Sequence, residues 1–134
     1  MDRVGYEGLA GFRFALRSFL ASSEVLCRRA GVTAQQYQAM LAVKTRQTET
    51  LAMKDLAEQL LLTPHAAVQL VDRLARAGLA WRKPSTEDRR SVSVELTEAG
   101  ERLLDRLAKQ HLDEMLRQEP QLSASLTRLK QLGG

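Results

Sequence analysis

The feature that most restricts how this chain can fold is a pair of short helical patterns joined by a tight turn. The first pattern covers residues 54–61 and repeats apolar side chains at helical spacing. Thr63 and Pro64 predict the start of the second helix, because threonine caps the first turn and proline lacks only an N–H that would be unpaired there. The apolar spacing carries this helix to about Ala77, and Gly78 is a typical stop.

A basic hairpin is predicted directly after the helix pair. Residues 79–82 and 91–96 read as two short strands, and the second of them alternates apolar and polar side chains. Between them, residues 83–89 contain the proline and small polar residues of a hairpin loop, with charges at its tip. Two helices with a charged hairpin behind them form the layout of a winged helix-turn-helix, in which the hairpin is the wing.

The spacing of apolar residues predicts which side of each helix is buried. In the first helix the inward residues are expected to be Leu56, Ala57 and Leu60. In the second they are expected to be Val68, Val71, Leu74 and Ala75. The opposite face of the second helix is the candidate recognition surface and holds His65, Ala66, Gln69, Asp72, Arg73 and Arg76.

Two helices are predicted before this unit. Residues 6–29 form the first, ended by Gly31, with an apolar stripe of Leu9, Phe12, Leu16, Phe19, Leu20 and Leu26. This stripe is buried either inside the monomer or against a second subunit. A capping box of Thr33 and Gln36 starts the second helix, at residues 34–44. Its apolar face is expected to hold Tyr37, Met40, Leu41 and Val43. Residues 45–50 read as a loop, and residues 51–52 as a possible short strand.

A long helix is predicted after the hairpin. Thr97 caps it and acidic residues favour its first turn, where the helix dipole is positive. It is expected to run to about Gln118, where Pro120 breaks it, with an apolar stripe of Leu104, Leu107, Ala108, His111, Leu112 and Met115. A short last helix carries Leu122, Leu126, Leu129 and Leu132. Because this strip is too narrow to fold alone, a bundle between two subunits is favoured over a monomer.

The balance of charge favours a partner that is negatively charged. The chain has 134 residues, which is one domain by length, and a formal net charge of +4. Residues 63–90 contain six basic and three acidic residues, whereas residues 98–119 contain four basic and six acidic ones. The positive surplus therefore lies on the helix pair and hairpin, where a surface facing phosphates needs it.

Several classes of protein are excluded or disfavoured. A single cysteine, Cys27, excludes an internal disulfide and a cysteine-based zinc site. No signal peptide and no apolar run of membrane-spanning length is visible, so we expect a cytoplasmic protein with no membrane partner. No spacing of carboxylates, nucleophile and base, or metal ligands supports catalysis, so neither an enzyme, a metal nor a cofactor is expected.

An ordered set of motifs resembles the MarR family of bacterial transcriptional regulators. The motifs are Leu56-Ala57-Glu58, Val71-Asp72-Arg73-Leu74, Ala77-Gly78-Leu79, Asp88-Arg89-Arg90 and Leu96-Thr97-Glu98-Ala99-Gly100. The similarity extends upstream to residues 30–37, so it covers nearly the whole chain. The chain departs from the family in its turn, where Leu60-Leu61-Leu62 stands in place of a glycine, and in a recognition face with few side chains that hydrogen-bond bases.

The resemblance implies a mainly α fold with a small β wing. Residues of about 33–97 would form the winged helix-turn-helix lobe of a single domain spanning residues 1–134, and about 1–32 and 98–134 its dimerisation helices. It also implies a homodimeric repressor that binds double-stranded DNA at a two-fold-symmetric site. Each recognition helix would enter a major groove and each wing a minor groove. A small aromatic effector, or oxidation in some members, would release the DNA.

These expectations select particular residues. The recognition-helix contacts are Thr63, His65, Ala66, Gln69 and Arg73, and the wing contacts are Lys83, Asp88, Arg89 and Arg90. Arg90 is the expected minor-groove residue, oriented by Asp88 through a charge-assisted contact. The dimerisation residues are Phe12, Leu16, Phe19, Leu122, Leu126 and Leu129, and the candidate ligand pocket comprises Tyr37, Met40 and His111.

Blander alternatives stay open for several of these residues. Arg90 and Asp88 would also fit a solvated ion pair on the hairpin, and His111 would fit a hydrogen-bonded core residue. Cys27 lies beside Arg28 and Arg29, which could lower its pKa, but a helical cysteine is more often a small apolar filler. For the whole chain, the alternatives are a winged-helix module that binds proteins and a small-molecule-binding protein that does not bind DNA.

Overall fold

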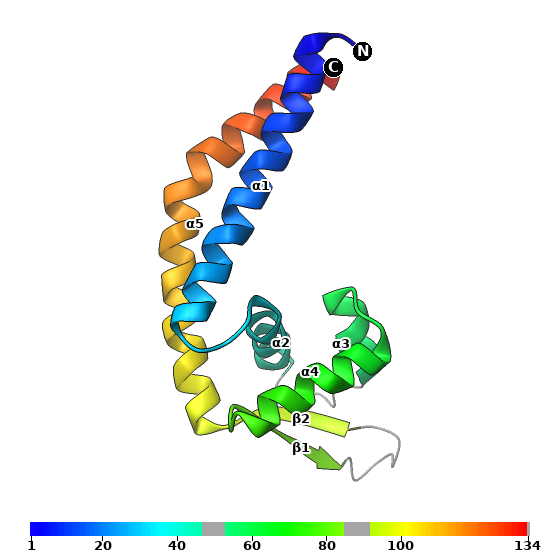
Figure 1. Ribbon diagram of the computed structural model, residues 1–134, viewed down its shortest axis with the longest axis vertical. Helices are drawn as coiled ribbons and strands as arrows, with labels where there is room; N and C mark the ends of the chain where they lie inside the picture. The colour runs from blue at the N-terminus through cyan, green and yellow to red at the C-terminus, as the bar shows by residue number, and fades with distance from the viewer. Residues whose placement is uncertain (47–52, 85–91, 134) are drawn as a thin grey trace.

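The computed structural model describes residues 1–46, 53–84 and 92–133, and it has two visible parts. The elements, in chain order, are α1 (Arg3–Arg29), α2 (Ala34–Thr45), α3 (Met53–Leu60), α4 (Pro64–Arg76), β1 (Ala80–Pro84), β2 (Val92–Leu96) and α5 (Glu98–Gly133). In Figure 1, α1 and α5 lie side by side as a long arm with both termini at its far end. The remaining elements form a lobe at the other end, so the predicted α fold with a two-stranded wing is confirmed.

Local capping explains where most of these helices begin. The Thr33 hydroxyl accepts a hydrogen bond from the Gln36 N–H at 3.1 Å, and the Gln36 side chain accepts one from the Thr33 N–H at 2.8 Å, which is the predicted capping box. Thr63 accepts from the Ala66 N–H ahead of Pro64, and Thr97 accepts from the Gly100 N–H at the start of α5. These starts are determined by residues within four positions, so the sequence alone predicts them.

The hairpin is joined to α5 by a close approach of two backbones. Strands β1 and β2 pair antiparallel, with Ala80 opposite Leu96. The Thr97 N–H donates to the Leu79 carbonyl oxygen at 3.0 Å, and the Thr97 hydroxyl donates to the Gly78 carbonyl oxygen at 2.6 Å. A Cβ atom at Gly100 would overlap the Leu79 carbonyl oxygen, so only glycine allows α5 to start there.

The lobe core is built from α2, α3, α4 and the hairpin. Its largest fully buried side chains include Met40, Leu56, Val71 and Leu74, and Leu107 of α5 packs into the same core. The predicted inward residues of α2 and α3 are buried or half-buried, except Leu41, which is exposed. Of the predicted loop at residues 45–50, Thr45 instead ends α2, and residues 47–50 lie outside the described residues, as does the possible strand at 51–52.

The buried face of α4 differs from the predicted one. The structure buries Ala67, Leu70, Val71 and Leu74. Val68 is only half-buried and Ala75 is exposed, so the prediction was wrong for these two residues. The observed set follows the i, i+3, i+4, i+7 spacing of a helix face, and α4 contacts α2, α3 and β1 with it. Periodicity alone favoured the larger Val68 over Ala67. The small Ala67 side chain fits the close contact of α4 with its neighbours better.

The apolar stripe of α1 lies beside, rather than inside, its contact with α5. The contact buries the small residues Gly8, Ala15, Ser23 and Cys27, which allow the two helices to approach closely. Leu9, Leu16 and Leu20 remain 46%, 40% and 51% exposed. Burial of these three leucines within the monomer is therefore wrong. On α5, Leu112 and Met115 of the predicted stripe are exposed in the same way.

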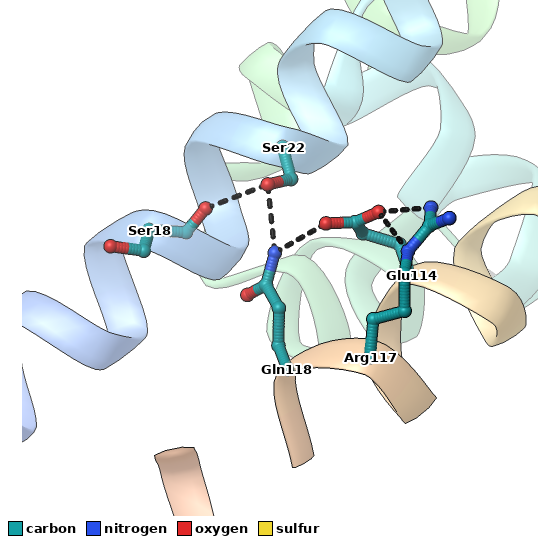
Figure 2. A network of polar contacts seen from close by, with 5 residues as sticks. All are labelled: Ser18, Ser22, Glu114, Arg117 and Gln118. Carbon is teal, nitrogen blue, oxygen red and sulfur yellow. Dashed lines mark hydrogen bonds and ion pairs between the residues drawn. The ribbon is translucent and has the colours of Figure 1, made fainter. Parts of the chain in front are cut away.

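The prediction that Pro120 breaks the last helix is also wrong, because α5 continues from Glu98 to Gly133. A proline inside a helix removes one backbone hydrogen bond and costs roughly 3 kcal/mol, which packing on both sides can offset. Before the proline, the Gln118 amide donates to the Ser22 hydroxyl of α1 at 2.8 Å (Figure 2). Beyond it, Leu129 and Leu132 pack against Gly8 of α1.

Figure 2 shows that the Gln118 contact belongs to a small polar network on the arm. The Gln118 amide also donates to the Glu114 carboxylate at 2.7 Å, and Arg117 pairs with the same carboxylate. The hydrogen bond from Gln118 has the largest effect on the pKa of Glu114 and lowers it, and the one from Arg117 lowers it further. This carboxylate is therefore ionised at neutral pH. The network fixes the register of α5 against α1 just before Pro120.

A buried histidine joins the arm to the lobe. His111 of α5 donates from Nδ1 to the Leu107 carbonyl oxygen at 2.7 Å, since a carbonyl can only accept. In the neutral ring Nε2 is then an acceptor, and the Ser23 hydroxyl of α1 donates to it at 2.8 Å. The ring also stacks on Tyr37 of α2, with ring centroids 4.0 Å apart. His111 therefore contacts three helices with both ring nitrogens hydrogen-bonded.

No helix within residues 1–46, 53–84 and 92–133 combines the length and the apolar character needed to cross a bilayer.

We predict that His111→Ala lowers the free energy of unfolding by roughly 2–4 kcal/mol, because it opens a cavity and leaves the buried Ser23 hydroxyl without its partner. Urea unfolding at one fixed protein concentration measures this loss. The matched control is Gln110→Ala, one residue earlier on the exposed side of α5. An unfolding midpoint of His111→Ala that coincides with that of the control would contradict the role given to this histidine.

Candidate nucleic-acid interface

The exposed face of α4 is the centre of the candidate site. Thr63, His65, Gln69 and Arg73 are exposed and Ala66 is half-buried, so the five predicted recognition-helix residues share the solvent side of one helix. This follows from the burial of Ala67, Leu70, Val71 and Leu74 on the other side. A helix with one face packed in the lobe and the other free to solvent has the shape that a DNA major groove accepts.

An ion pair ties this helix to the wing. The Arg82 guanidinium of β1 contacts the Asp72 carboxylate of α4 at 2.7 Å and donates to the Val68 carbonyl oxygen at 3.3 Å. Two contacts from one planar guanidinium restrict its position more than a single point contact does. These contacts link β1, at the root of the wing, to α4. The sequence analysis missed this pair, because one residue lies on a helix and the other on a strand. Opposite charge without a sequence spacing does not select one pair among many.

Lys83 lies at the root of the wing and already has partners on it. Its ammonium group is 3.0 Å from the Glu95 carboxylate of β2 and 4.8 Å from the centroid of the Trp81 ring. Both side chains of the ion pair are about half exposed, and such pairs contribute at most about 1 kcal/mol. A phosphate can therefore replace Glu95 as partner at low cost. The other predicted wing residues, Asp88, Arg89 and Arg90, lie outside the described residues.

The residues predicted to line a ligand pocket come together in the core between arm and lobe. Tyr37, Met40 and His111 are all buried, and Tyr37 stacks on His111. Burial raises the pKa of the Tyr37 hydroxyl. An open space lies elsewhere: a groove of about 240 Å³ runs along the arm between α1 and α5. Its apolar lining includes Ala15, Phe19, Leu112, Met115, Leu116 and Leu122. The three predicted pocket residues do not line this groove.

The predicted dimerisation residues lie along the arm. Phe12, Phe19, Leu122 and Leu129 are half-buried between α1 and α5, whereas Leu16 and Leu126 are exposed. Further large apolar side chains are exposed beside them, among them Leu112 and Leu116. The arm thus carries a continuous apolar strip, and its groove, on a surface that the chain itself leaves uncovered.

Cys27 is enclosed at the base of the arm. Its side chain is 0% exposed, and its sulfur lies 4.0 Å from Nε2 of His111. Burial is the main influence on its pKa and raises it, while a hydrogen bond with Ser23 lowers it by less. The thiol is therefore protonated at neutral pH. Burial and a raised pKa agree with the alternative in which Cys27 is a small apolar filler. A redox sensor needs the opposite, a low pKa.

Comparison with known sequences agrees with this geometry. A family model described as the MarR family matches residues 30–91. The organic hydroperoxide resistance transcriptional regulator of Bacillus subtilis is 39% identical over 75 residues, which are 56% of this chain and 50% of that protein. The uncharacterised HTH-type transcriptional regulator YhbI of the same species is 33% identical over 88 residues, 66% of this chain and 56% of that protein. The chain therefore spans about half the length of the curated relatives that it matches.

Solved structures show the same fold over almost the whole chain. AbsC, a MarR family transcriptional regulator from Streptomyces coelicolor, superposes with a TM-score of 0.83 at 20% identity, covering 98% of this chain and 90% of AbsC. A complex of MepR from S. aureus with DNA superposes with a TM-score of 0.70 at 20% identity, covering 92% and 94% of the two chains. At this identity the structures establish the fold. Together with the sequence matches, they show that this chain resembles the MarR family in sequence over residues 30–91 and in fold over nearly its whole length.

Proposed function

We propose that this protein binds double-stranded DNA as a homodimer and represses transcription until a small molecule releases it. The observation that carries the proposal is the exposed face of α4, held next to the wing by the pair of Asp72 and Arg82. A helix with a wing next to it would match a major groove and its neighbouring minor groove together. The relative MepR, which has the same fold, is known in complex with DNA.

Charge supports a duplex as the partner. Arg73 and Arg76 are exposed on α4, and Arg82 and Lys83 on β1 add positive charge beside them. Such residues attract phosphates and supply most of the affinity of DNA-binding proteins, without reading the sequence. Gln69 is the exposed residue of α4 best suited to a base, because an amide pairs with N6 and N7 of adenine. Arg90 on the wing completes the proposed interface through the minor groove.

A homodimer is proposed because of the apolar strip on the arm. Leu9, Leu16 and Leu20 of α1 and Leu112 and Leu116 of α5 are exposed in the single chain. A closed two-fold interface between identical arms covers such surfaces most economically. The dimer would present two copies of α4, so the DNA site is proposed to have two-fold symmetry. Both ends of the chain, residues of about 1–32 and 98–134, would then serve dimerisation, and residues 33–97 would form the lobe.

A small aromatic effector is proposed to release the DNA. The groove of about 240 Å³ between α1 and α5 is apolar enough for such a molecule and lies on the proposed dimer surface. The core between arm and lobe, with Tyr37, Met40 and His111, is the second candidate place. An effector at either place would act on the spacing of the two lobes. Action on DNA also implies that the protein works in the cytoplasm of a bacterium.

Selection of bound sequences from a random pool of duplexes tests the proposal directly. We expect the enriched sequences to share a motif with two-fold symmetry and a binding affinity that falls steeply with salt. A pool without enrichment, together with weak binding that is insensitive to salt, would instead favour the protein-binding or small-molecule-binding alternatives.

We predict that Arg73→Ala and Gln69→Ala impair DNA binding in different ways. Arg73 is a fixed cation, so its loss should weaken binding to all sequences and reduce the magnitude of the salt slope by roughly 1 per lobe. Gln69 carries no charge, so its loss should leave the salt slope unchanged and relax the preference at one position per half-site, at a cost of about 1–3 kcal/mol. Fluorescence anisotropy over a salt series measures both. Identical behaviour of the two variants would contradict the roles given to this helix.

We predict that Leu116→Glu converts the dimer into a monomer that is still folded. Leu116 is 64% exposed in the single chain, so a charge there disturbs little within the monomer but would be buried unpaired in the dimer. Light scattering gives the mass, and circular dichroism checks the fold. The control Trp81→Glu places the same charge at an exposed apolar residue of the lobe and should stay dimeric. A monomeric wild-type protein at micromolar concentration would contradict the proposed assembly.

We predict that Cys27→Ser does not change any release of DNA by organic hydroperoxide. One relative is a regulator of organic hydroperoxide resistance, but the buried Cys27 thiol of this chain has a raised pKa and is protonated at pH 7. In the native protein a thiol reagent should react slowly, and in urea quickly. Our assignment fails if peroxide releases DNA from the wild type and not from the variant.

A further inference from the structure

Leu61, in the turn between α3 and α4, has a backbone conformation that suits glycine. Its φ is 57°, and it is the one non-glycine residue with positive φ in the part of the chain that the structure describes. Two hydrogen bonds hold it there, from the Leu61 N–H to the Glu58 carbonyl oxygen at 3.2 Å and from the Leu62 N–H to the Ala57 carbonyl oxygen at 2.8 Å. This pattern normally ends a helix on glycine, because a Cβ atom is strained in that conformation.

Packing within the chain does not compensate for the strain. The neighbours Leu60 and Leu62 are half-buried against the hydrophobic core. The Leu61 side chain is 93% exposed, so it gains almost nothing from burial. The side chain of this strained residue does not stabilise the folded chain. Strain of this kind is typical of residues that have a functional role, here in contact with another molecule.

The position of Leu61 suggests that function. It lies two residues before Thr63, the cap of α4, and therefore within about 8 Å of chain from the end of the helix that would enter the major groove. Beside Thr63 and His65, which can hydrogen-bond, that end holds Ala66 and Val68, whose side chains offer no hydrogen bond to a base. The only apolar group that a base pair presents in the major groove is the C5 methyl of thymine, which apolar side chains contact.

We propose that Leu61 is a specificity-determining residue that contacts a thymine methyl group within each half-site. The inference rests on the proposed DNA binding and deepens it. Leucine in place of glycine lowers the stability of the turn. In the complex with DNA, the exposed side chain would make a favourable contact with the base. Readout of this kind needs no charge, so it adds preference for a sequence without adding general affinity for DNA.

Replacement of thymine by deoxyuridine tests the contact, because it removes the methyl group and leaves base pairing intact. Each thymine of the selected duplex is replaced in turn, and affinities are measured for the wild type and L61G. The wild type should lose about fourfold at one thymine per half-site, the value of one buried methyl group. L61G should show no loss at that thymine and unchanged responses at the others, because glycine suits the positive φ and lacks the side chain.

Two further variants separate the contact from effects on folding. L61N tolerates the same backbone conformation without an apolar side chain and should also be insensitive, whereas L61M keeps an apolar side chain and should retain the loss. Thermal melting checks that each variant is folded. Equal sensitivity of the wild type and L61G at every thymine overturns this inference and leaves DNA binding intact. A wild type that binds no duplex overturns the proposed function itself.

Discussion

The contacts of His111 with Ser23 and Tyr37 join the arm to the lobe through buried, paired groups. Its ring nitrogens are both hydrogen-bonded and its face is stacked, so the ring has one position among three helices. A buried polar group that is fully paired specifies an arrangement more strictly than apolar packing does. In a dimer built through the arms, the angle between arm and lobe would determine the distance between the two copies of α4. Under the proposed assembly, a core contact far from the DNA surface would therefore be a determinant of half-site spacing.

A second level of rigidity lies within the lobe. Arg82 holds the wing to α4 through Asp72, and the start of α5 is pressed against Leu79 at a point where only Gly100 fits. The hairpin is thus fixed at its root on two sides. The root of the hairpin is thereby linked both to α4 and to the start of α5.

The sequence predicted features that depend on neighbouring residues and failed where distant contacts decide. The caps at Thr33, Thr63 and Thr97 were predicted correctly, because each is formed within four residues. Pro120 was expected to end a helix, but contacts of α5 with α1 on both sides of the proline keep the helix continuous. The pair of Asp72 and Arg82 and the contact of Ser23 with His111 join residues with no spacing rule between them, so periodicity could not reveal them.

The composition of the candidate interface separates affinity from sequence preference. Its cations, such as Arg73 on α4 and Lys83 on the wing, would bind phosphates of any sequence. The neutral residues at the start of α4 are few and mostly small, so few direct hydrogen bonds to bases are available. Preference must then come from one or two neutral side chains, together with the shape of the minor groove at the wing. Under this division, loss of a cation could reduce affinity tenfold without changing which sequence is bound. Substitution of a residue in the turn could change the preferred sequence with little effect on general affinity for DNA.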